Sequence, residues 1–243
     1  MQIDPFSLKS KSKLSPERLA FTARARANDY LAMLRFNTYA ISACILPELP
    51  APPVDTAWSD TAVTREQLQH LLMALAATEE LGGAVVEIGS YRGVTAAALA
   101  SSTARTVVAV DPFLGGYGAT NMDYDTFKRR IQGIANLVHV RSTSGAAAAG
   151  WNHGPASLIF IDAVHDYANV SFDISVWWPK LIVGGIMAFH DTDDANFPGT
   201  RRAVHELFAR GAELYAHPHN ITLLRKLAHN DRLKCETMGA DRA

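Results

Sequence analysis

The sequence is poor in cysteine, in net charge and in long apolar runs. Its two cysteines, Cys44 and Cys235, lie far apart and outside any Cys-x-x-Cys spacing, which argues against a disulfide framework or a structural zinc site. The formal net charge is only −1, from 23 basic and 24 acidic residues, so no overall field attracts nucleic acid or an anionic membrane. No apolar run approaches the roughly eighteen residues of a membrane span. We therefore expect a cytoplasmic protein with no nucleic-acid or membrane partner.

The composition and the prolines suggest a core domain with an appendage. The chain has 243 residues, of which 48% are hydrophobic, enough for one substantial core. Ser15-Pro16 is a helix-capping pair, the chain stays helix-prone to about Leu46, and four prolines then follow before residue 54. These features predict a helical appendage with a Pro-rich connector over residues 1–60, a core domain over 61–228 and a polar tail over 229–243.

Short, almost wholly apolar runs alternate with helical patterns through the core domain. Such runs are typical of a parallel sheet that is covered on both faces. The pattern predicts a doubly wound, mostly parallel seven-stranded sheet that ends in an antiparallel hairpin. The strands are expected near residues 84–89, 106–111, 136–141, 157–162 and 184–190, with the hairpin at 213–216 and 221–224.

A glycine turn follows the first of these strands. Glu87 closes the strand, and Gly89 and Gly93 then lead into an alanine-rich helix, as in a loop built to approach a ligand. Asp111 lies about twenty residues farther on, where such folds place an acid on ribose hydroxyls. The Gly-x-Gly pair that admits a pyrophosphate is missing, so a nucleoside without phosphates fits better than a dinucleotide. An NAD-dependent dehydrogenase stays as a weaker alternative, beside a non-enzymatic cofactor-binding module.

With these motifs the chain resembles the class I S-adenosylmethionine-dependent methyltransferases. Residues 87–93 look like their first motif, Asp111 like their ribose-binding acid and residues 160–162 like their fourth motif. The block over residues 157–192, which ends in Gly-Gly-Ile-Met-Ala-Phe-His-Asp, is similar to the branch that holds small-molecule and sugar O-methyltransferases. The resemblance implies that S-adenosylmethionine is bound by Glu87, Gly89, Ser90, Tyr91, Gly93, Asp111, Thr143, Ser144 and Asp162.

Asp162 and His165 are the residues that the resemblance places for chemistry. Methyl transfer from a sulfonium to a hydroxyl requires the acceptor to be aligned and its proton removed or neutralised. We expect His165 to act as the base beside Asp162, and the alternative is that His165 only caps the helix that follows. Members of the family often have Gly-Asp after the fourth-motif acid, whereas this chain has Ala163-Val164, which removes one candidate metal ligand.

A metal site is the second hypothesis. Asp162 and the pair His190-Asp191 end neighbouring strands of the predicted sheet, and together they could hold Mg²⁺ or another divalent cation. Because successive residues of a strand point to opposite faces, only one of the pair should face the cleft, and we expect it to be Asp191. Without a metal, His190 and Asp191 would cap the next loop and bind substrate.

Two further segments invite a functional interpretation. The Gly-rich residues 115–121 suggest a lid over the acceptor or a simple connector. Trp177 and Trp178 resemble a substrate cage but are expected to pack against the sheet.

The sequence therefore predicts an S-adenosylmethionine-dependent O-methyltransferase for a small-molecule acceptor, acting as a homodimer or higher homo-oligomer. A metal-independent N- or C-methyltransferase is the alternative that the sequence leaves open. The shapes of the appendage and of loop 112–122 decide the acceptor, and neither follows from sequence.

Overall fold

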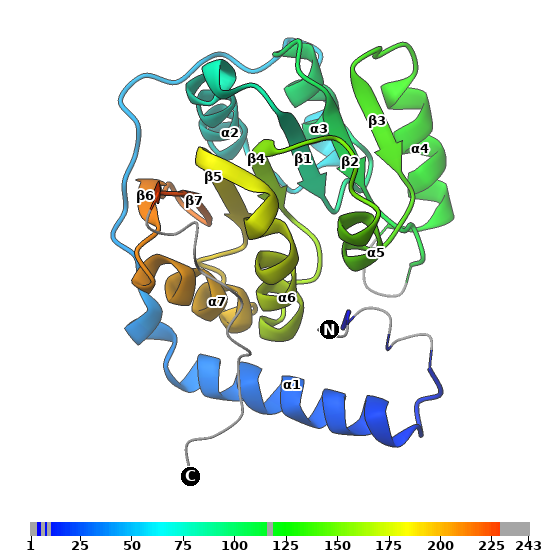
Figure 1. Cartoon of the computed structure of the whole chain (residues 1–243), viewed down its shortest axis with the longest axis vertical. Coiled ribbons are helices and arrows are strands. Elements are labelled where there is room, and N and C mark those ends of the chain that lie inside the picture. Colours follow the sequence, from blue (N-terminus) through cyan, green and yellow to red (C-terminus); the bar gives the residue numbers. More distant parts are fainter. Residues whose placement is uncertain (1–3, 6–7, 9–10, 116–118, 229–243) are drawn as a thin grey trace.

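A computed structural model describes residues 4–5, 8, 11–115 and 119–228 (Figure 1). The predicted tail, 229–243, and residues 116–118 of the predicted lid lie outside the described residues. Seven strands form one sheet: β1 (Ala84–Ile88), β2 (Val107–Val110), β3 (Leu137–Val140), β4 (Ala156–Ile161), β5 (Leu181–His190), β6 (Glu213–Ala216) and β7 (Ile221–Arg225). The α-helices are α1 (Pro16–Leu34), α2 (Arg65–Ala77), α3 (Val94–Ser101), α4 (Asn121–Ile131), α5 (Ser144–Ala149), α6 (Tyr167–Trp177) and α7 (Pro198–Ala209). Short 3-10 turns are η2 (Phe36–Tyr39), η3 (Trp58–Asp60), η4 (Glu79–Leu81) and η5 (Trp178–Lys180).

The strand order β3-β2-β1-β4-β5-β7-β6 confirms the predicted doubly wound sheet. Strands β1 to β5 pair in parallel, and β7 runs antiparallel to both β5 and β6, which makes the terminal hairpin. The chain leaves β1 toward β2 on one side and returns through β4 on the other, so strand order reverses between β1 and β4. Ligands bind at such a point in open α/β sheets, beyond the carboxyl ends of the strands.

One strand boundary differs from the prediction. Strand β5 begins at Leu181 rather than near residue 184, because the chain stays in the sheet through an irregularity that includes Gly184. Gly184 has a φ of +85°, a conformation that glycine adopts without strain. The two glycines therefore mark a bulge inside the strand and not its start.

The two faces of the sheet are covered by different helices, and the alternation of side chains along each strand decides which residues meet which layer. Val86, Ile88 and Ile159 pack with α5, α6 and α7. Val85 and Phe160 pack with α2 and α3 on the opposite face. Trp177 and Trp178 are buried in the first of these layers, which confirms that they pack against the sheet.

Helices α1 and α2 begin with side-chain caps, and the first of these is the Ser15-Pro16 start predicted from the sequence. The Ser15 side chain accepts from the Arg18 backbone with Pro16 at the first helical position, and Thr64 and Gln67 form a complete capping box. Helix α1 lies along the outside of α6 and α7 (Figure 1). After it, the chain runs past the far sheet edge, where Cys44 makes an isolated antiparallel bridge to His217. In the part of the chain that the structure describes, none of the helices has the length and apolar character to cross a membrane.

Candidate active site

The glycine turn after β1 is shaped by neighbouring protein atoms. Gly89 has a φ of +92°, and a Cβ on it would overlap the carbonyl oxygen of Asp162. Gly93 has a φ of +74°, and its Cβ would lie 2.8 Å from the ring of Phe127. Each glycine therefore leaves room for the protein's own packing, and their predicted role in the approach of a ligand stays a prediction. Gly93 is also absent from the wall of the cavity described next.

A cavity of about 440 Å³ opens at the carboxyl ends of β1, β2 and β4. Its wall contains eight of the nine residues predicted to bind a cofactor: Glu87, Gly89, Ser90, Tyr91, Asp111, Thr143, Ser144 and Asp162. His165 lines the same cavity. The volume lies in the range of small-molecule and cofactor sites. The residues quoted from separate sequence motifs therefore meet in one place.

Asp111 lies at the centre of this wall. Its Oδ2 accepts the backbone N–H of Tyr91 at 3.1 Å and its Oδ1 accepts that of Phe113 at 2.8 Å. Burial raises the pKa of Asp111, and these backbone donors oppose the rise. The carboxylate thus ties the glycine loop to the end of β2 and presents its remaining lone pairs to the cavity, as an acceptor of ribose hydroxyls requires.

Glu87 is buried beneath the loop. Burial raises its pKa to about 8, against the opposing effect of the Ser90 hydroxyl. Its Oε2 has no hydrogen-bond partner among the described residues, and such an orphan buried oxygen is costly. A cationic or N–H group of a bound molecule would satisfy it, which fits the predicted place at the methionine end of the cofactor.

The far end of the cavity is built by α5 and α6. Thr143 caps α5 and donates its hydroxyl to Asp4 Oδ2 at 2.9 Å. Ser144 donates to Asp173 Oδ1 at 2.5 Å and accepts from Trp177 Nε1 at 2.8 Å. Burial raises the pKa of Asp173 to about 7. These groups form a polar pocket at the position predicted for adenine.

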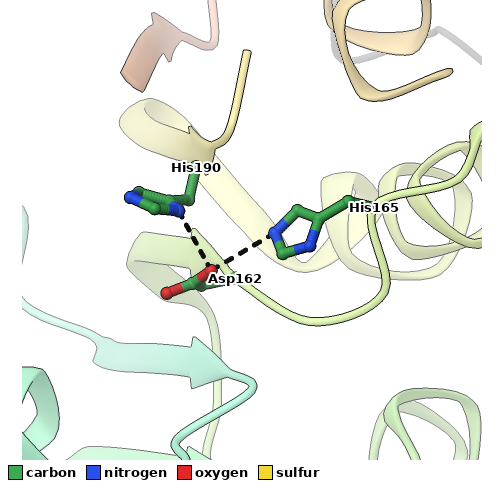
Figure 2. Close-up of side chains that lie close together, drawn as sticks. All are labelled: Asp162, His165 and His190. Atoms are coloured by element: carbon green, nitrogen blue, oxygen red, sulfur yellow. Dashed lines mark ion pairs between the residues drawn. The ribbon is translucent and has the colours of Figure 1, made fainter. Parts of the chain in front are cut away.

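The predicted chemical residues converge beyond the end of β4. Figure 2 shows His165 and His190 on opposite sides of Asp162. His165 Nε2 and His190 Nδ1 each lie 3.3 Å from Asp162 Oδ1. Asp191 closes the group, with its Oδ2 3.4 Å from His165 Nε2 and its Oδ1 3.3 Å from His190 Nδ1. The ligating atoms of Asp162, His165 and His190 all fall within 4.8 Å of one another.

The expectation that Asp191 faces the cleft and His190 points away is wrong, because both join the Asp162 cluster and neither is among the residues that line the cavity. Strand β5 ends at His190, and Asp191 has a φ of +56°. Strand alternation therefore stops at His190, and the left-handed turn swings the next carboxylate back toward the same centre. Asn220 holds Asp191 there by donating to its Oδ1 at 2.8 Å.

Charges within the cluster stabilise one another. Burial alone would raise the pKa of Asp162, but the two imidazoles outweigh it and hold that pKa well below its usual range. Burial alone would lower the pKa of His190, but Asp162 and Asp191 raise it to about 10. The same imidazoles lower the pKa of Asp191. In the metal-free protein, the His190 imidazolium thus offsets part of the charge of the two carboxylates.

His165 does not cap the helix that follows it. Asp166 is the N-cap of α6, and its side chain accepts the backbone N–H of Asn169 at 2.7 Å. The His165 ring packs instead against Phe197, with 4.8 Å between ring centroids. The capping alternative is therefore wrong, and the imidazole is free to face the cavity.

Several residues of the site were not singled out from the sequence. Arg92 pairs with Asp60 and Asp123 at 2.8 Å each, which ties η3 to the glycine loop. Asp4 and Asp60 enter the cavity wall from the N-terminal segment. No pattern marks these acids, since their approach depends on the tertiary path of the chain. Asp173 belongs to the block over residues 157–192, so its position there could have marked it.

Comparisons with known proteins agree with this geometry. Residues 86–192 match a family model described as a methyltransferase domain. A search of curated proteins gave no match. Among solved structures, the chain is similar to CalS11, a TDP-rhamnose 3'-O-methyltransferase of calicheamicin biosynthesis, with 17% identity, a TM-score of 0.53 and coverage of 90% of this chain and 98% of that one.

Two other solved structures share the fold. The O-methyltransferase NovP has 16% identity and a TM-score of 0.56 over 84% of this chain and 99% of its own. An O-methyltransferase from Bacillus cereus, in complex with SAH, has 16% identity and a TM-score of 0.51 over 81% and 91%. At these identities the likeness concerns the fold, and the family model concerns the domain that carries the site. The comparisons therefore show a methyltransferase domain over residues 86–192, within a chain that shares the fold of these O-methyltransferases.

Proposed function

We propose that this enzyme transfers the methyl group of S-adenosylmethionine to a hydroxyl oxygen of a small molecule. The observation that carries the proposal is the position of Asp162 and His165, which line the same cavity as Asp111 and the glycine loop. A cofactor lying on Asp111 would have its sulfonium between the loop and these two side chains. A polar, proton-accepting group at that point suits an acceptor that has a proton to lose.

The reaction is an in-line displacement. The acceptor oxygen forms a bond to the methyl carbon, the bond from that carbon to sulfur breaks, and its electron pair stays on the sulfur of S-adenosylhomocysteine. The hydroxyl proton leaves toward the Asp162–His165 pair. The protein's contribution is alignment of the two reactants and disposal of this proton.

The lone pair of His165 Nε2 has two possible uses. It can take the acceptor proton directly, with Asp162 stabilising the resulting imidazolium. It can instead join Asp162, His190 and Asp191 around a divalent cation, since the donor atoms lie 3.3–3.4 Å apart. Such an ion supplies an anchor for the acceptor oxygen and a lower pKa for its proton.

The acceptor class is supported by analogy of fold. CalS11 is described as a TDP-rhamnose 3'-O-methyltransferase and NovP as an O-methyltransferase. We take the acceptor to be a sugar or another polyol-like small molecule of comparable size. A transfer to nitrogen or carbon is the competing activity, and it needs no metal ion.

Substitution of His165 tests the proposal. His165→Ala should lower turnover at least about a hundredfold, the usual contribution of a general base. The affinity for S-adenosylhomocysteine, measured by calorimetry, should stay within a few fold. His153→Ala is the matched control, because His153 contacts Trp151 away from the cavity. Full turnover in His165→Ala with a panel of sugar hydroxyl acceptors would sink the proposal.

A further inference from the structure

The Asp162 cluster, formed by Asp162, His165, His190 and Asp191, contains two imidazole nitrogens that can ligate a metal ion. His190 is only 4% exposed, yet its Nδ1 has no hydrogen-bond partner within the described part of the chain, and neither has His165 Nε2. Both atoms lie 3.3 Å from the same oxygen, Asp162 Oδ1. Two imidazole nitrogens directed at one carboxylate oxygen define a position at which a cation can replace the Nδ1 proton of the metal-free His190 imidazolium.

Gln67 fixes which nitrogen of His190 faces this position. Gln67 Oε1 accepts the Thr64 backbone N–H at 2.8 Å, and Gln67 Nε2 donates to the carbonyl of His219 at 3.1 Å. The amide orientation is therefore set by its own neighbours. Since Gln67 Oε1 also lies 3.2 Å from His190 Nε2, that nitrogen must carry the hydrogen. Nδ1 is left toward the cluster, and a hydrogen-bonded second nitrogen is the usual arrangement of a metal-ligating histidine.

The spacing of the donors favours a small ion with short bonds. In a tetrahedral site with bonds of about 2.0–2.1 Å, neighbouring donor atoms lie about 3.3 Å apart. Asp162 Oδ1 lies 3.3 Å from both imidazole nitrogens, and one donor atom from each of Asp162, His165 and His190 lies within 4.8 Å of the other two. Magnesium takes oxygen ligands in octahedral geometry and keeps several waters, whereas imidazole suits zinc and the other first-row transition metals.

We propose that this site binds a nitrogen-preferring first-row transition-metal ion such as Zn²⁺, through His165, His190 and Asp162, and that it discriminates against Mg²⁺. The inference rests on the proposed function, and it assigns His165 Nε2 the role of a metal ligand rather than that of the direct proton acceptor. Gln67 is then a positioning residue, which acts on the ion through His190.

Metal binding is measured without turnover. The protein is stripped with a chelator and titrated with Zn²⁺, Co²⁺ or Mg²⁺ by calorimetry, and metal content after dialysis is measured by mass spectrometry. We expect one equivalent of Zn²⁺ or Co²⁺ and at least a hundredfold weaker binding of Mg²⁺. Intense visible absorption of the Co²⁺ form reports tetrahedral coordination by nitrogen and oxygen. Equal or tighter binding of Mg²⁺, or no binding of any of the three, overturns the inference.

Variants distinguish the metal ligands, His165 and His190, from Gln67, which positions His190. His165→Ala and His190→Ala should each lose the equivalent of Zn²⁺, and His153→Ala should keep it. Gln67→Leu should weaken Zn²⁺ binding about 10–100-fold, as removal of such an outer partner usually does, whereas Gln67→Glu keeps an acceptor for His190 Nε2 and should restore it. Thermal unfolding shows whether Gln67→Leu stays folded after losing its capping box. If Gln67→Leu does not fold, a Zn²⁺ affinity of Gln67→Glu equal to that of the wild type supports the positioning role of Gln67. If both variants fold and bind Zn²⁺ as tightly as the wild type, the positioning role is overturned.

Failure of the metal inference is distinguishable from failure of the proposed function. If the protein binds no transition metal but methylates hydroxyls with a loss in His165→Ala, the proton-acceptor role of His165 stands and only the metal inference falls. If the metal binds and hydroxyls are not methylated, the proposed acceptor class falls.

A second inference comes from α1, whose amphipathic character is inverted. Its polar side packs on the core domain: Asp29 Oδ1 accepts the Tyr167 backbone N–H at 3.0 Å, and Asn28 accepts from Arg202 at 3.3 Å. Its outward side is mostly apolar. At 100° per residue, ten of the twelve exposed positions fall on one arc, and only one of these ten is charged: Pro16, Leu19, Ala20, Ala23, Arg26, Ala27, Tyr30, Leu31, Met33 and Leu34. The other two exposed positions, Glu17 and Arg24, border this arc.

This outer face of α1 is complementary to itself. Ala23 and Ala27 lie at its middle and large side chains at both ends, where Leu19 is 51% and Leu34 is 62% exposed. A twofold axis between the two alanines places residues 19 and 31 opposite each other and lets the small side chains bring the helices close. The exposed Glu17 and Arg35 flank the face at opposite ends. In an antiparallel pair they come within about two residues, or about 3 Å along the axis, of each other on the same flank, whereas a parallel pair places the two copies of Glu17 on opposite flanks and leaves both charges without this partner.

We propose that the outer face of α1 is the contact surface for a second copy of this chain, with the two α1 helices antiparallel. Sedimentation equilibrium should give a dimer, and Ala23→Glu should shift it to monomer. Glu17→Arg and Arg35→Glu should each weaken the dimer, and the double variant should restore it, which only the antiparallel arrangement allows. A monomer at all concentrations, an Ala23→Glu dimer, or binding of the monomer to anionic lipid vesicles through this face overturns the proposal.

Discussion

The buried carboxyl of Asp173 makes the stability of the apo-protein depend on pH in a defined window. Asp173 is 4% exposed, and burial raises its pKa from an ordinary value of 3.8 to about 7. Between these two values the folded chain retains a proton that the unfolded chain releases. Stability therefore falls as pH rises from about 4 to about 7, and the full cost persists above that range.

The perturbation is Asp173→Asn, which keeps the shape and an oxygen for the Ser144 hydroxyl but removes the charge. A difference of about three pKa units, at about 1.36 kcal/mol each, corresponds to at most about 4 kcal/mol. We expect the variant to match the wild type near pH 4 and to exceed its free energy of unfolding by about 2–4 kcal/mol at pH 8.

Urea unfolding of both proteins at pH 4, 6 and 8 measures this difference. Other titrating groups are common to the two proteins and cancel in the comparison. Ser144→Ala is a useful companion, because loss of the hydroxyl donor should deepen the destabilisation above pH 7. Parallel curves of stability against pH for wild type and Asp173→Asn would refute the reasoning.

Three further predictions follow from single contacts. Gly89→Ala forces a Cβ onto the Asp162 carbonyl at a φ of +92° and should cost at least about 2 kcal/mol of unfolding free energy, measured in urea; a neutral result would mean that the loop and β4 can separate. Arg105→Met removes hydrogen bonds to the carbonyls of Leu75 and Thr78, at 2.6 and 3.0 Å, and to the hydroxyl of Ser157 at 2.7 Å. The free energy of unfolding should fall by about 3 kcal/mol in the same assay. A fall below about 1 kcal/mol would contradict this prediction. Arg92→Gln releases Asp60 and should weaken S-adenosylhomocysteine binding by calorimetry while the melting temperature changes little, and unaltered affinity would show that η3 needs no tether.

The sheet and its order of elements could be predicted from sequence because the signals were local. Apolar runs of four to six residues favour buried strands, and the first run, over residues 84–88, lies between two glycines that mark its ends. Asp111 and Asp162 could be placed on the same grounds, since residues that end parallel strands must meet at one edge of the sheet. The methyltransferase domain followed from their order.

Tertiary structure alone decided how the site is completed. Sequence spacing assigns His190 and Asp191 to opposite faces, and only the left-handed turn at Asp191, held by Asn220 from the distant hairpin, brings both to Asp162. Gln67 lies 123 residues from His190, and no local pattern links a capping residue to the tautomer of a histidine. The sequence by itself determined the cofactor end of the enzyme, because that end is built from strand termini. The reacting end depends on long-range packing and turn geometry, which the sequence does not express locally.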